Sequence, residues 1–254
     1  MQMNTAVRAS KRAIEKESAP WRQLEFLPTP PWATRALMED VFPGFAGRSI
    51  WEPCAGLGHM SDVLAERLVT VRASDVYGYP TADGHDARQY GVEKFDFLDE
   101  SKVAEQPMYD WIVTNPPFSK AAEMLPIALS KAICGVAFLL RIQWLEGASR
   151  FYRVYHKMGP TFVAPFCERV PMCGGGWDVE GSSATMYAWF VWLNGADWQF
   201  SRNGEIPLRL IPPGRAGLRS RDSDARNFGG RHVPGWIAPS KLKTGSRQQS
   251  EMEV

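Results

Sequence analysis

The feature that most constrains the fold is an alternation of short apolar runs and helix-like stretches over residues 28–200. The apolar runs have the length and the aromatic or β-branched content of strands, and helical spacing follows several of them. Strands separated by helical crossovers pair in parallel, with helices on both faces of the sheet. The expected strands are 49–51, 69–76, 111–113, 135–142, 162–166 and 186–193. The sequence therefore predicts an α/β fold, in which ligands bind beyond the carboxyl ends of the strands.

Composition excludes several classes of protein. The 254 residues are 44% hydrophobic and 22% charged, with a formal net charge of +1, so the whole chain is not a strongly basic nucleic-acid binder. Four scattered cysteines support neither a zinc site nor a disulfide framework, and we expect reduced thiols in a cytoplasmic protein. Residues 1–22 lack the apolar core of a secretory signal, and the apolar run 133–140 is too short to span a bilayer.

Three zones differ in composition. Residues 1–27 are polar and charged and are expected to form a loosely ordered arm or a late-docking helix, while residues 28–200 form the folded domain. Residues 201–254 are rich in Gly, Pro, Ser and Arg, and ten Lys and Arg stand against five Asp and Glu. This basic tail is expected to bury little and to be partly flexible. It either follows the phosphates of a nucleic acid or is simply solvated.

A glycine-containing loop follows the first expected strand. It reads Glu-Pro-Cys-Ala-Gly-Leu-Gly over residues 52–58, and its glycines allow a tight turn and close approach to a ligand. A dinucleotide-binding loop would carry a third glycine where this chain has Ser61, and a phosphate-binding loop would end in Gly-Lys-Ser or Gly-Lys-Thr. The loop is therefore either a plain strand-to-helix turn or a site for a nucleoside without phosphates, such as S-adenosylmethionine. Glu52 at the strand end suits a ligand with an amine.

Two acidic residues further along suit other parts of an adenosine. Asp75 closes the next strand, where a carboxylate can accept hydrogen bonds from both ribose hydroxyls. The alternative is a solvated acid in a turn before Tyr77 and Gly78. Asp96 offers an acceptor for an adenine amino group, and Phe97 offers apolar atoms beside the ring.

The sequence Asn115-Pro116-Pro117-Phe118 follows another strand and carries the most specific chemistry. Two consecutive prolines stiffen the turn and leave carbonyls without helical partners. The Asn115 side-chain oxygen and the Pro116 carbonyl can both accept hydrogen bonds from an amino group, and an aromatic ring at position 118 can stack on a planar base. Methyl transfer from an activated sulfonium to such an amine requires no metal, because positioning supplies most of the catalysis.

These motifs together resemble the amino-group class of S-adenosylmethionine-dependent methyltransferases, in particular DNA N6-adenine enzymes with Asn-Pro-Pro-Phe or Asn-Pro-Pro-Tyr. The resemblance covers residues 29–193 and implies a seven-stranded sheet with helices on both faces and an antiparallel last strand. The small size looks like that of phage or prophage enzymes, acting in a bacterial or infected host cell. By resemblance, the catalytic residues are Asn115, Pro116, Pro117 and Phe118, and the cofactor is held by Thr29, Pro30, Glu52, Cys54, Gly56, Gly58, Asp75, Asp96, Phe97 and Asn115.

The motif holds a planar amino group of any kind, so the substrate stays open between DNA adenine, RNA and protein glutamine. A non-catalytic nucleic-acid-binding module of the same fold is a further alternative. An oxidoreductase is disfavoured by the missing third glycine and by the lack of a catalytic His or Tyr-Lys pair. The Gly-rich loop 168–183, with Trp177 expected to be exposed, is a candidate for stacking where a base is flipped out, or it is a turn.

Overall fold

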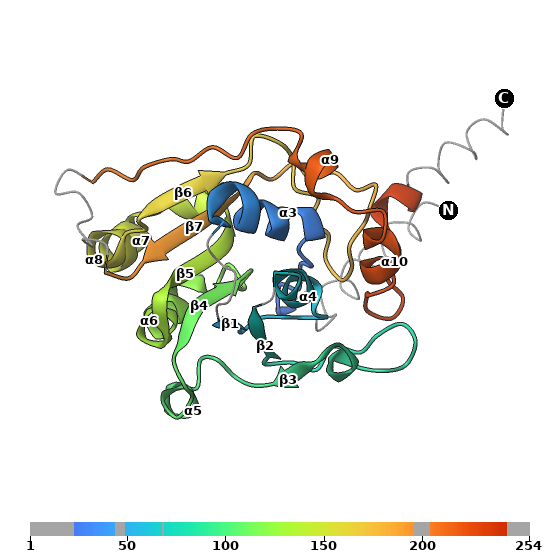
Figure 1. Ribbon diagram of the computed structural model, residues 1–254, viewed down its shortest axis with the longest axis horizontal. Helices are drawn as coiled ribbons and strands as arrows, with labels where there is room; N and C mark the ends of the chain where they lie inside the picture. Colours follow the sequence, from blue (N-terminus) through green and yellow to red (C-terminus); the bar gives the residue numbers. More distant parts are fainter. Residues whose placement is uncertain (1–22, 44–48, 68, 196–203, 243–254) are drawn as a thin grey trace, which may run out of the picture.

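A computed structural model describes residues 23–43, 49–67, 69–195 and 204–242. Seven strands form one sheet in the order β3-β2-β1-β4-β5-β7-β6, in which β7 runs antiparallel to its neighbours β5 and β6 (Figure 1). The pairs β1–β2, β1–β4, β2–β3 and β4–β5 are parallel. The strands are β1 (Ser49–Glu52), β2 (Thr70–Asp75), β3 (Val92–Lys94), β4 (Tyr109–Thr114), β5 (Ala132–Arg141), β6 (Phe162–Pro165) and β7 (Tyr187–Leu193). The expected α/β sheet with an antiparallel last strand is confirmed.

Helical segments cover both faces of this sheet. They are α3 (Pro31–Ala36), η1 (Leu37–Val41), α4 (His59–Ala65), η3 (Ala87–Tyr90), α5 (Glu100–Ala104), α6 (Ala121–Lys131), η4 (Ile142–Leu145), α7 (Ala148–Arg150), η5 (Phe151–Tyr155), α8 (His156–Met158), α9 (Arg215–Arg219) and α10 (Asp224–Phe228). Residues 148–158 form three consecutive helical segments, which are α7, the π-helical turn η5 and α8. None of the helices that the structure describes is long and apolar enough to cross a membrane.

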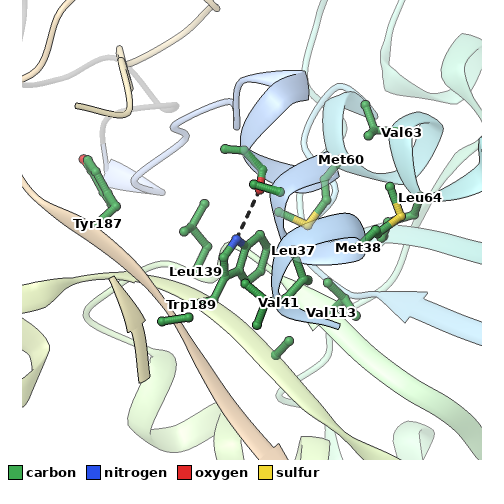
Figure 2. Packing of buried hydrophobic residues seen from close by; sticks show 14 of the residues in the cluster. Leu37, Met38, Val41, Met60, Val63, Leu64, Val113, Leu139, Tyr187 and Trp189 are labelled. Carbon is green, nitrogen blue, oxygen red and sulfur yellow. Dashed lines mark hydrogen bonds between the residues drawn. The ribbon is translucent and has the colours of Figure 1, made fainter. Parts of the chain in front are cut away.

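Strand β5 shows why its sequence is continuously apolar. Its side chains alternate between two cores, with Phe138 and Leu140 packing against the α6 side and Ala137 and Leu139 against the α3 and α4 side. On the second side, Leu139 meets the apolar residues of η1, and the Trp189 indole donates a hydrogen bond to the Ala33 carbonyl (3.2 Å; Figure 2). Full burial of a side chain such as Leu139 contributes roughly 1.5–3 kcal/mol. The two-sided core fixes where the strand ends lie.

Most residues of the segment 204–242 are exposed, but the segment is attached to the rest of the domain at several points. Residues 207–211 continue the sheet beyond β6 through hydrogen bonds such as Arg209 N–H to the Val163 carbonyl (2.9 Å). Further on, Ile211, Phe228 and Val233 are buried. These apolar residues are isolated among Gly, Pro and Arg, so no periodic pattern in the sequence predicts their burial. The boundary expected near residue 200 stays a prediction, and 201–203 and 243–254 lie outside the described residues.

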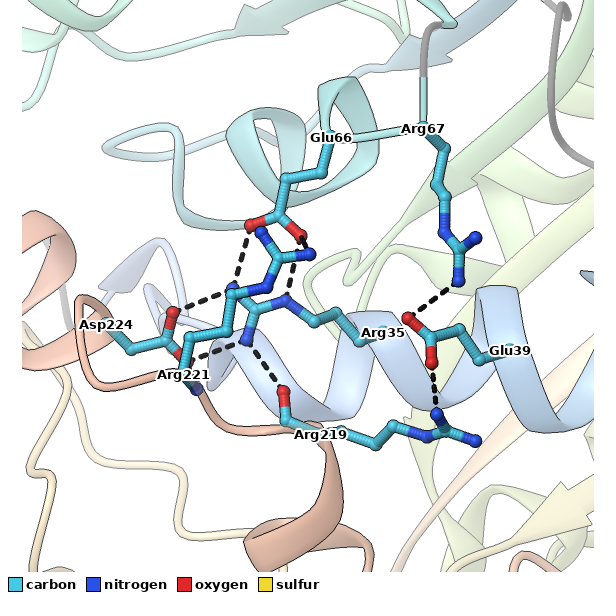
Figure 3. Close-up of polar contacts among 7 residues, drawn as sticks. All are labelled: Arg35, Glu39, Glu66, Arg67, Arg219, Arg221 and Asp224. Atoms are coloured by element: carbon cyan, nitrogen blue, oxygen red, sulfur yellow. Dashed lines mark hydrogen bonds and ion pairs between the residues drawn. The ribbon is translucent and has the colours of Figure 1, made fainter.

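An ion-pair network, here called the Arg35 cluster (Arg35, Glu39, Glu66, Arg67, Arg219, Arg221 and Asp224), fastens the C-terminal segment to α3 and α4 (Figure 3). The buried Arg35 guanidinium donates to both oxygens of Glu66 and both oxygens of Asp224 at 2.7–2.8 Å. It also donates to the Arg219 carbonyl (2.8 Å). Since Arg215 and Arg219 also pair with Asp40, part of the tail's positive charge is neutralised within the protein.

Candidate active site

A cavity of about 270 Å³ lies at the carboxyl ends of β1, β2 and β4, the edge at which α/β sheets bind ligands. The structure brings eight of the site residues expected from sequence together in its wall: Thr29, Glu52, Cys54, Asp75, Asp96, Phe97, Asn115 and Pro117. Five others lie beside the cavity without contributing to its described lining: Pro30, Gly56, Gly58, Pro116 and Phe118. The expected residues therefore converge, but the glycines shape the site instead of lining it.

The glycine loop owes its form to backbone conformations that other residues rarely adopt. Gly56 and Gly58 have φ angles of 57° and 76°, in the left-handed region. A Cβ atom added at Gly56 would lie 2.3 Å from the Phe26 ring, so the close approach there also requires glycine. The turn points the Gly56 N–H at Asp75 (2.9 Å to Oδ2). The two glycines therefore connect the ends of β1 and β2 and allow α4 to begin at His59.

Asp75 is held in place by backbone donors and is almost fully buried. Its carboxylate accepts hydrogen bonds from the N–H groups of Gly56 (2.9 Å) and Tyr77 (3.0 Å). Burial raises the pKa of Asp75 to about 6, although these backbone hydrogen bonds act in the opposite direction. A carboxylate has about four acceptor positions, so Asp75 can accept further hydrogen bonds from a ligand's hydroxyl groups.

Glu52 is a second buried carboxyl group in the same wall. Its side chain is 2% exposed, and Oε2 has no hydrogen-bond partner among the described residues. Burial, and secondarily the nearby Asp75, raise the pKa of Glu52 well above its usual range. A buried acceptor without a partner is costly unless a ligand satisfies it. An amine of a bound ligand would supply both a donor and a compensating charge.

His59 lines the cavity but does not take part in proton chemistry near neutral pH. Burial, and secondarily the Arg231 charge, lower its pKa to about 3, so the imidazole is uncharged. It is the first residue of α4. The opposite end of the cavity is bounded by Asp96, whose Oδ1 accepts from the Leu98 N–H (2.9 Å), and by the buried Phe97 ring. These two residues offer a polar rim beside an apolar surface.

The orientation of the Asn115 amide follows from its neighbours. Its Nδ2 donates to the Leu27 carbonyl (2.8 Å) and to Thr29 Oγ1 (3.2 Å). Because a carbonyl only accepts, the amide nitrogen must face Leu27, and Oδ1 is directed to the other side. The Phe118 ring beyond it is half-buried, with the Arg141 guanidinium 4.6 Å from its centroid and the Tyr187 ring at 6.2 Å. Asn115 thus presents an acceptor beside an aromatic ring.

Residues 23–29, here called the N-terminal strap, line the cavity; sequence reasoning named Thr29 but missed residues 23–28. The expected arm of 1–27 ends in residues that line the cavity, and the part described does not behave as a loose arm. Phe26 is buried and stacks on Tyr79 with ring centroids 4.3 Å apart. The adjacent apolar residues Phe26 and Leu27, which precede Pro28 and Thr29, were the available signal. Residues 1–22 lie outside the described part of the chain.

Trp177 is also not where the sequence suggested. It is 5% exposed and belongs to the core on the α3 side, because the loop 168–183 is held at several points. Gly175 donates to the Phe26 carbonyl (3.1 Å) and accepts from the Val233 N–H (2.9 Å). Ser240 Oγ donates to Asp178 (2.7 Å). The expectation of an exposed tryptophan for base stacking is therefore wrong.

The sequence matches no known family profile and no curated protein, whereas its fold has counterparts among solved structures. A Pyrococcus horikoshii structure described as a candidate RNA methyltransferase has a TM-score of 0.50 at 14% identity, covering 70% of this chain and 91% of that chain. The type I restriction-modification methyltransferase subunit of Streptococcus thermophilus gives 0.48 at 11% identity, covering 87% and 52%. The 16S rRNA N2 G1207 methyltransferase of Thermus thermophilus, solved with AdoMet and guanosine, gives 0.39 at 17%, covering 63% and 42%.

The strand order and the first of these similarities define the class of fold. A seven-stranded sheet in the order β3-β2-β1-β4-β5-β7-β6, with β7 antiparallel, is the class I methyltransferase arrangement. This chain therefore has the Rossmann-like class I methyltransferase fold.

Proposed function

We propose that the protein transfers a methyl group from S-adenosylmethionine to an amino nitrogen, most specifically the exocyclic N6 amine of adenine in DNA. The observation that carries the proposal is Asn115, whose amide is oriented by Leu27 and Thr29 at the wall of the cavity that holds Glu52 and Asp75. Among the described residues, the carboxylates of Glu52 and Asp75 have no cationic partner, which suits a cationic cofactor rich in hydroxyl groups. The Asn115 amide oxygen beside them suits the amine that receives the methyl group.

The donor set of the cavity fits this cofactor. Asp75 has acceptor positions left for two ribose hydroxyls, and the unpartnered Oε2 of Glu52 suits the amino group of the methionine moiety. Asp96 and Phe97 offer an acceptor and an apolar edge to the adenine. Cys54, Thr29 and Pro30 complete the proposed binding residues, and Gly56 and Gly58 act through the shape of the loop.

The catalytic residues act by positioning. When bound, the cofactor supplies an electrophilic methyl group. Asn115 Oδ1 and the Pro116 carbonyl accept the two N–H bonds of the target amine, which directs its lone pair toward that methyl. Pro117 keeps the turn rigid because its φ is fixed, and Phe118 stacks on the target base. Effective molarities of well-oriented groups make positioning alone worth about 7–11 kcal/mol of the barrier.

DNA adenine is chosen over RNA because the motifs taken together resemble those of DNA N6-adenine enzymes, whereas the Asn-Pro-Pro-Phe sequence by itself suits an amine of either nucleic acid. The C-terminal charge adds less support than its composition implies, since Arg215, Arg219 and Arg231 form ion pairs within the protein. Nucleic-acid binding through this segment would depend on its remaining exposed cations, for example Arg226.

The proposal is tested by incubating the protein with methyl-labelled S-adenosylmethionine and DNA, RNA or protein in parallel, followed by nucleoside and amino-acid analysis. We expect N6-methyladenine in DNA. Label in guanine or adenine of RNA would keep the mechanism and replace the substrate. No label in any arm, together with no cofactor binding by calorimetry, would contradict enzymatic function and favour a nucleic-acid-binding module.

A further inference from the structure

The N-terminal strap contacts the Asn115–Phe118 turn through Glu25. Among the described residues, Glu25 is the sole non-glycine with a positive φ, at 53°. A residue with a long side chain rarely adopts this conformation, and it persists where surrounding contacts hold it. The contacts that hold it here involve the turn that carries the proposed catalytic residues.

The Glu25 carboxylate accepts two hydrogen bonds from the backbone of this turn. Oε2 accepts from the Phe118 N–H (2.7 Å) and Oε1 from the Ser119 N–H (3.3 Å). Pro116 and Pro117 have no N–H group, so these are the first two backbone donors after Asn115. Hydrogen bonds to an ionised acceptor are roughly twice as strong as neutral ones. Glu25 therefore binds the first two backbone N–H groups that the turn offers to a carboxylate.

The strap also holds the beginning of the same turn. Leu27, two residues after Glu25, accepts the hydrogen bond from Asn115 Nδ2 (2.8 Å). One short segment thus binds the Asn115 side chain through a carbonyl and the Phe118 and Ser119 backbone through a carboxylate. The strap is itself fixed from behind, because the Phe26 carbonyl accepts from the Gly175 N–H (3.1 Å) and the Phe26 ring stacks on Tyr79.

We propose that Glu25 is a positioning residue, whose carboxylate fixes the Asn115–Phe118 turn so that the Asn115 acceptor and the Phe118 ring face the substrate together. This inference rests on the proposed function, because it assigns Glu25 a part in the same reaction. Glu25 acts through the backbone of Phe118 and Ser119 and does not take the proton that the methylated amine releases.

The test compares Glu25→Ala and Glu25→Gln with the control Glu123→Gln, an exposed carboxylate on α6 that pairs with Lys120. We expect Glu25→Ala to lower kcat about 10- to 100-fold, corresponding to one or two charge-assisted hydrogen bonds. Glu25→Gln retains one acceptor and should lose less, whereas a proton acceptor would be inactivated equally by both changes. Cofactor affinity by calorimetry should stay within about threefold in all variants, since hydrogen bonding to the cofactor is not lost.

A second readout does not depend on catalysis. Amide hydrogen exchange of the peptide containing Phe118 and Ser119 should be faster in Glu25→Ala than in wild type and Glu123→Gln. An active wild type with unchanged kcat and unchanged exchange in Glu25→Ala would overturn the inference. A loss of cofactor affinity as large as the loss of kcat would also overturn it, because Glu25 would then be a cofactor ligand. An inactive wild type that binds no cofactor would contradict the proposed function instead, while the exchange rates still report on Glu25.

Discussion

Two regions of this protein, the Arg35 cluster and the cavity, hold carboxylates beside α4. They differ in how the negative charge is compensated. In the Arg35 cluster, Glu66 and Asp224 each receive two hydrogen bonds from one guanidinium. In the cavity, Asp75 receives hydrogen bonds from neutral backbone groups, and Oε2 of Glu52 receives none from the described residues. Both regions remove charge from water, but among the residues that the structure describes, only the first region supplies a cation.

The difference separates a structural role from a ligand-binding role. Burial without a counter-charge is unfavourable, and the raised pKa values of Asp75 and Glu52 express this cost. Glu52 and Asp75 stand at the carboxyl ends of β1 and β2, where the surrounding chain buries them. Paired carboxylates therefore connect elements distant in sequence, whereas unpaired carboxylates mark the place where a ligand supplies the missing donors.

The largest effect is expected when the Arg35 cluster loses its central cation, so that its carboxylates resemble those of the cavity. Arg35→Met leaves the buried Asp224 without its cation and the partly exposed Glu66 with Arg221 alone, and should lower the free energy of unfolding by about 3–5 kcal/mol. Chemical denaturation measures this, with Arg88→Met as control because Arg88 forms an exposed pair with Asp86 and should cause no measurable change. A loss below about 1 kcal/mol would show that the cluster does not hold the C-terminal segment.

The second largest effect is expected in the cavity, on the rate of methyl transfer. Asn115→Ala removes the acceptor for the target amine and should lower kcat about 100- to 1000-fold, as the loss of one transition-state hydrogen bond does elsewhere. Cofactor affinity and stability should persist. The matched control Asn227→Ala, at an exposed position on α10, should leave the rate unchanged. Activity within tenfold of wild type would remove the catalytic role of Asn115.

Asp75→Ala tests the unpaired region directly and is expected to have a smaller effect. It removes one or two hydrogen bonds to the ribose hydroxyls and should weaken cofactor binding by about 1–3 kcal/mol. Unlike Arg35→Met, it should weaken binding more than stability, since it also removes an unfavourably buried charge. Calorimetric titration measures the affinity, with Asp222→Ala, at an exposed position before α10, as the control. Unchanged affinity would locate the ribose site elsewhere.

The sequence predicted the cavity region well because its chemistry is local. Asp75 and Asn115 stand directly after strands, and parallel strands bring their carboxyl ends to one edge of the sheet. Spacing along the chain was therefore enough to expect that these side chains meet. The loop glycines were also found, although they shape the turn more than they line the cavity.

The Arg35 cluster and the strap were not predicted, because their contacts depend on residues far apart in sequence. Arg35 and Asp224 are 189 positions apart, and Glu25 and Phe118 are 93 apart. Neither pair belongs to a periodic pattern. The charges of the tail looked available for a nucleic acid because composition does not reveal that Arg219 is paired within the fold.

The smallest effect is a pH dependence of cofactor affinity, which arises from Asp75 in the cavity. The pKa of Asp75 is about 6 in the folded protein, so protonation below that pH removes an acceptor for the ribose. Between pH 7 and pH 5 the ionised fraction falls about tenfold, and cofactor affinity should fall to a similar extent. The cofactor's own α-carboxyl group titrates below this range and its α-amino group above it. Neutral His59, with a pKa of about 3, adds nothing.

The same raised pKa makes the ionisation of Asp75 unfavourable for folding, since the unfolded chain ionises near pH 3.8. The free energy of unfolding that Asp75 contributes is therefore retained below about pH 4 and is lost as the pH rises through 6, opposite in direction to cofactor affinity. Titration of Asp75→Asn against cofactor between pH 5 and pH 7 should give a flat profile. If the slope persists in this variant, Glu52, whose pKa is also raised, is the group that controls binding.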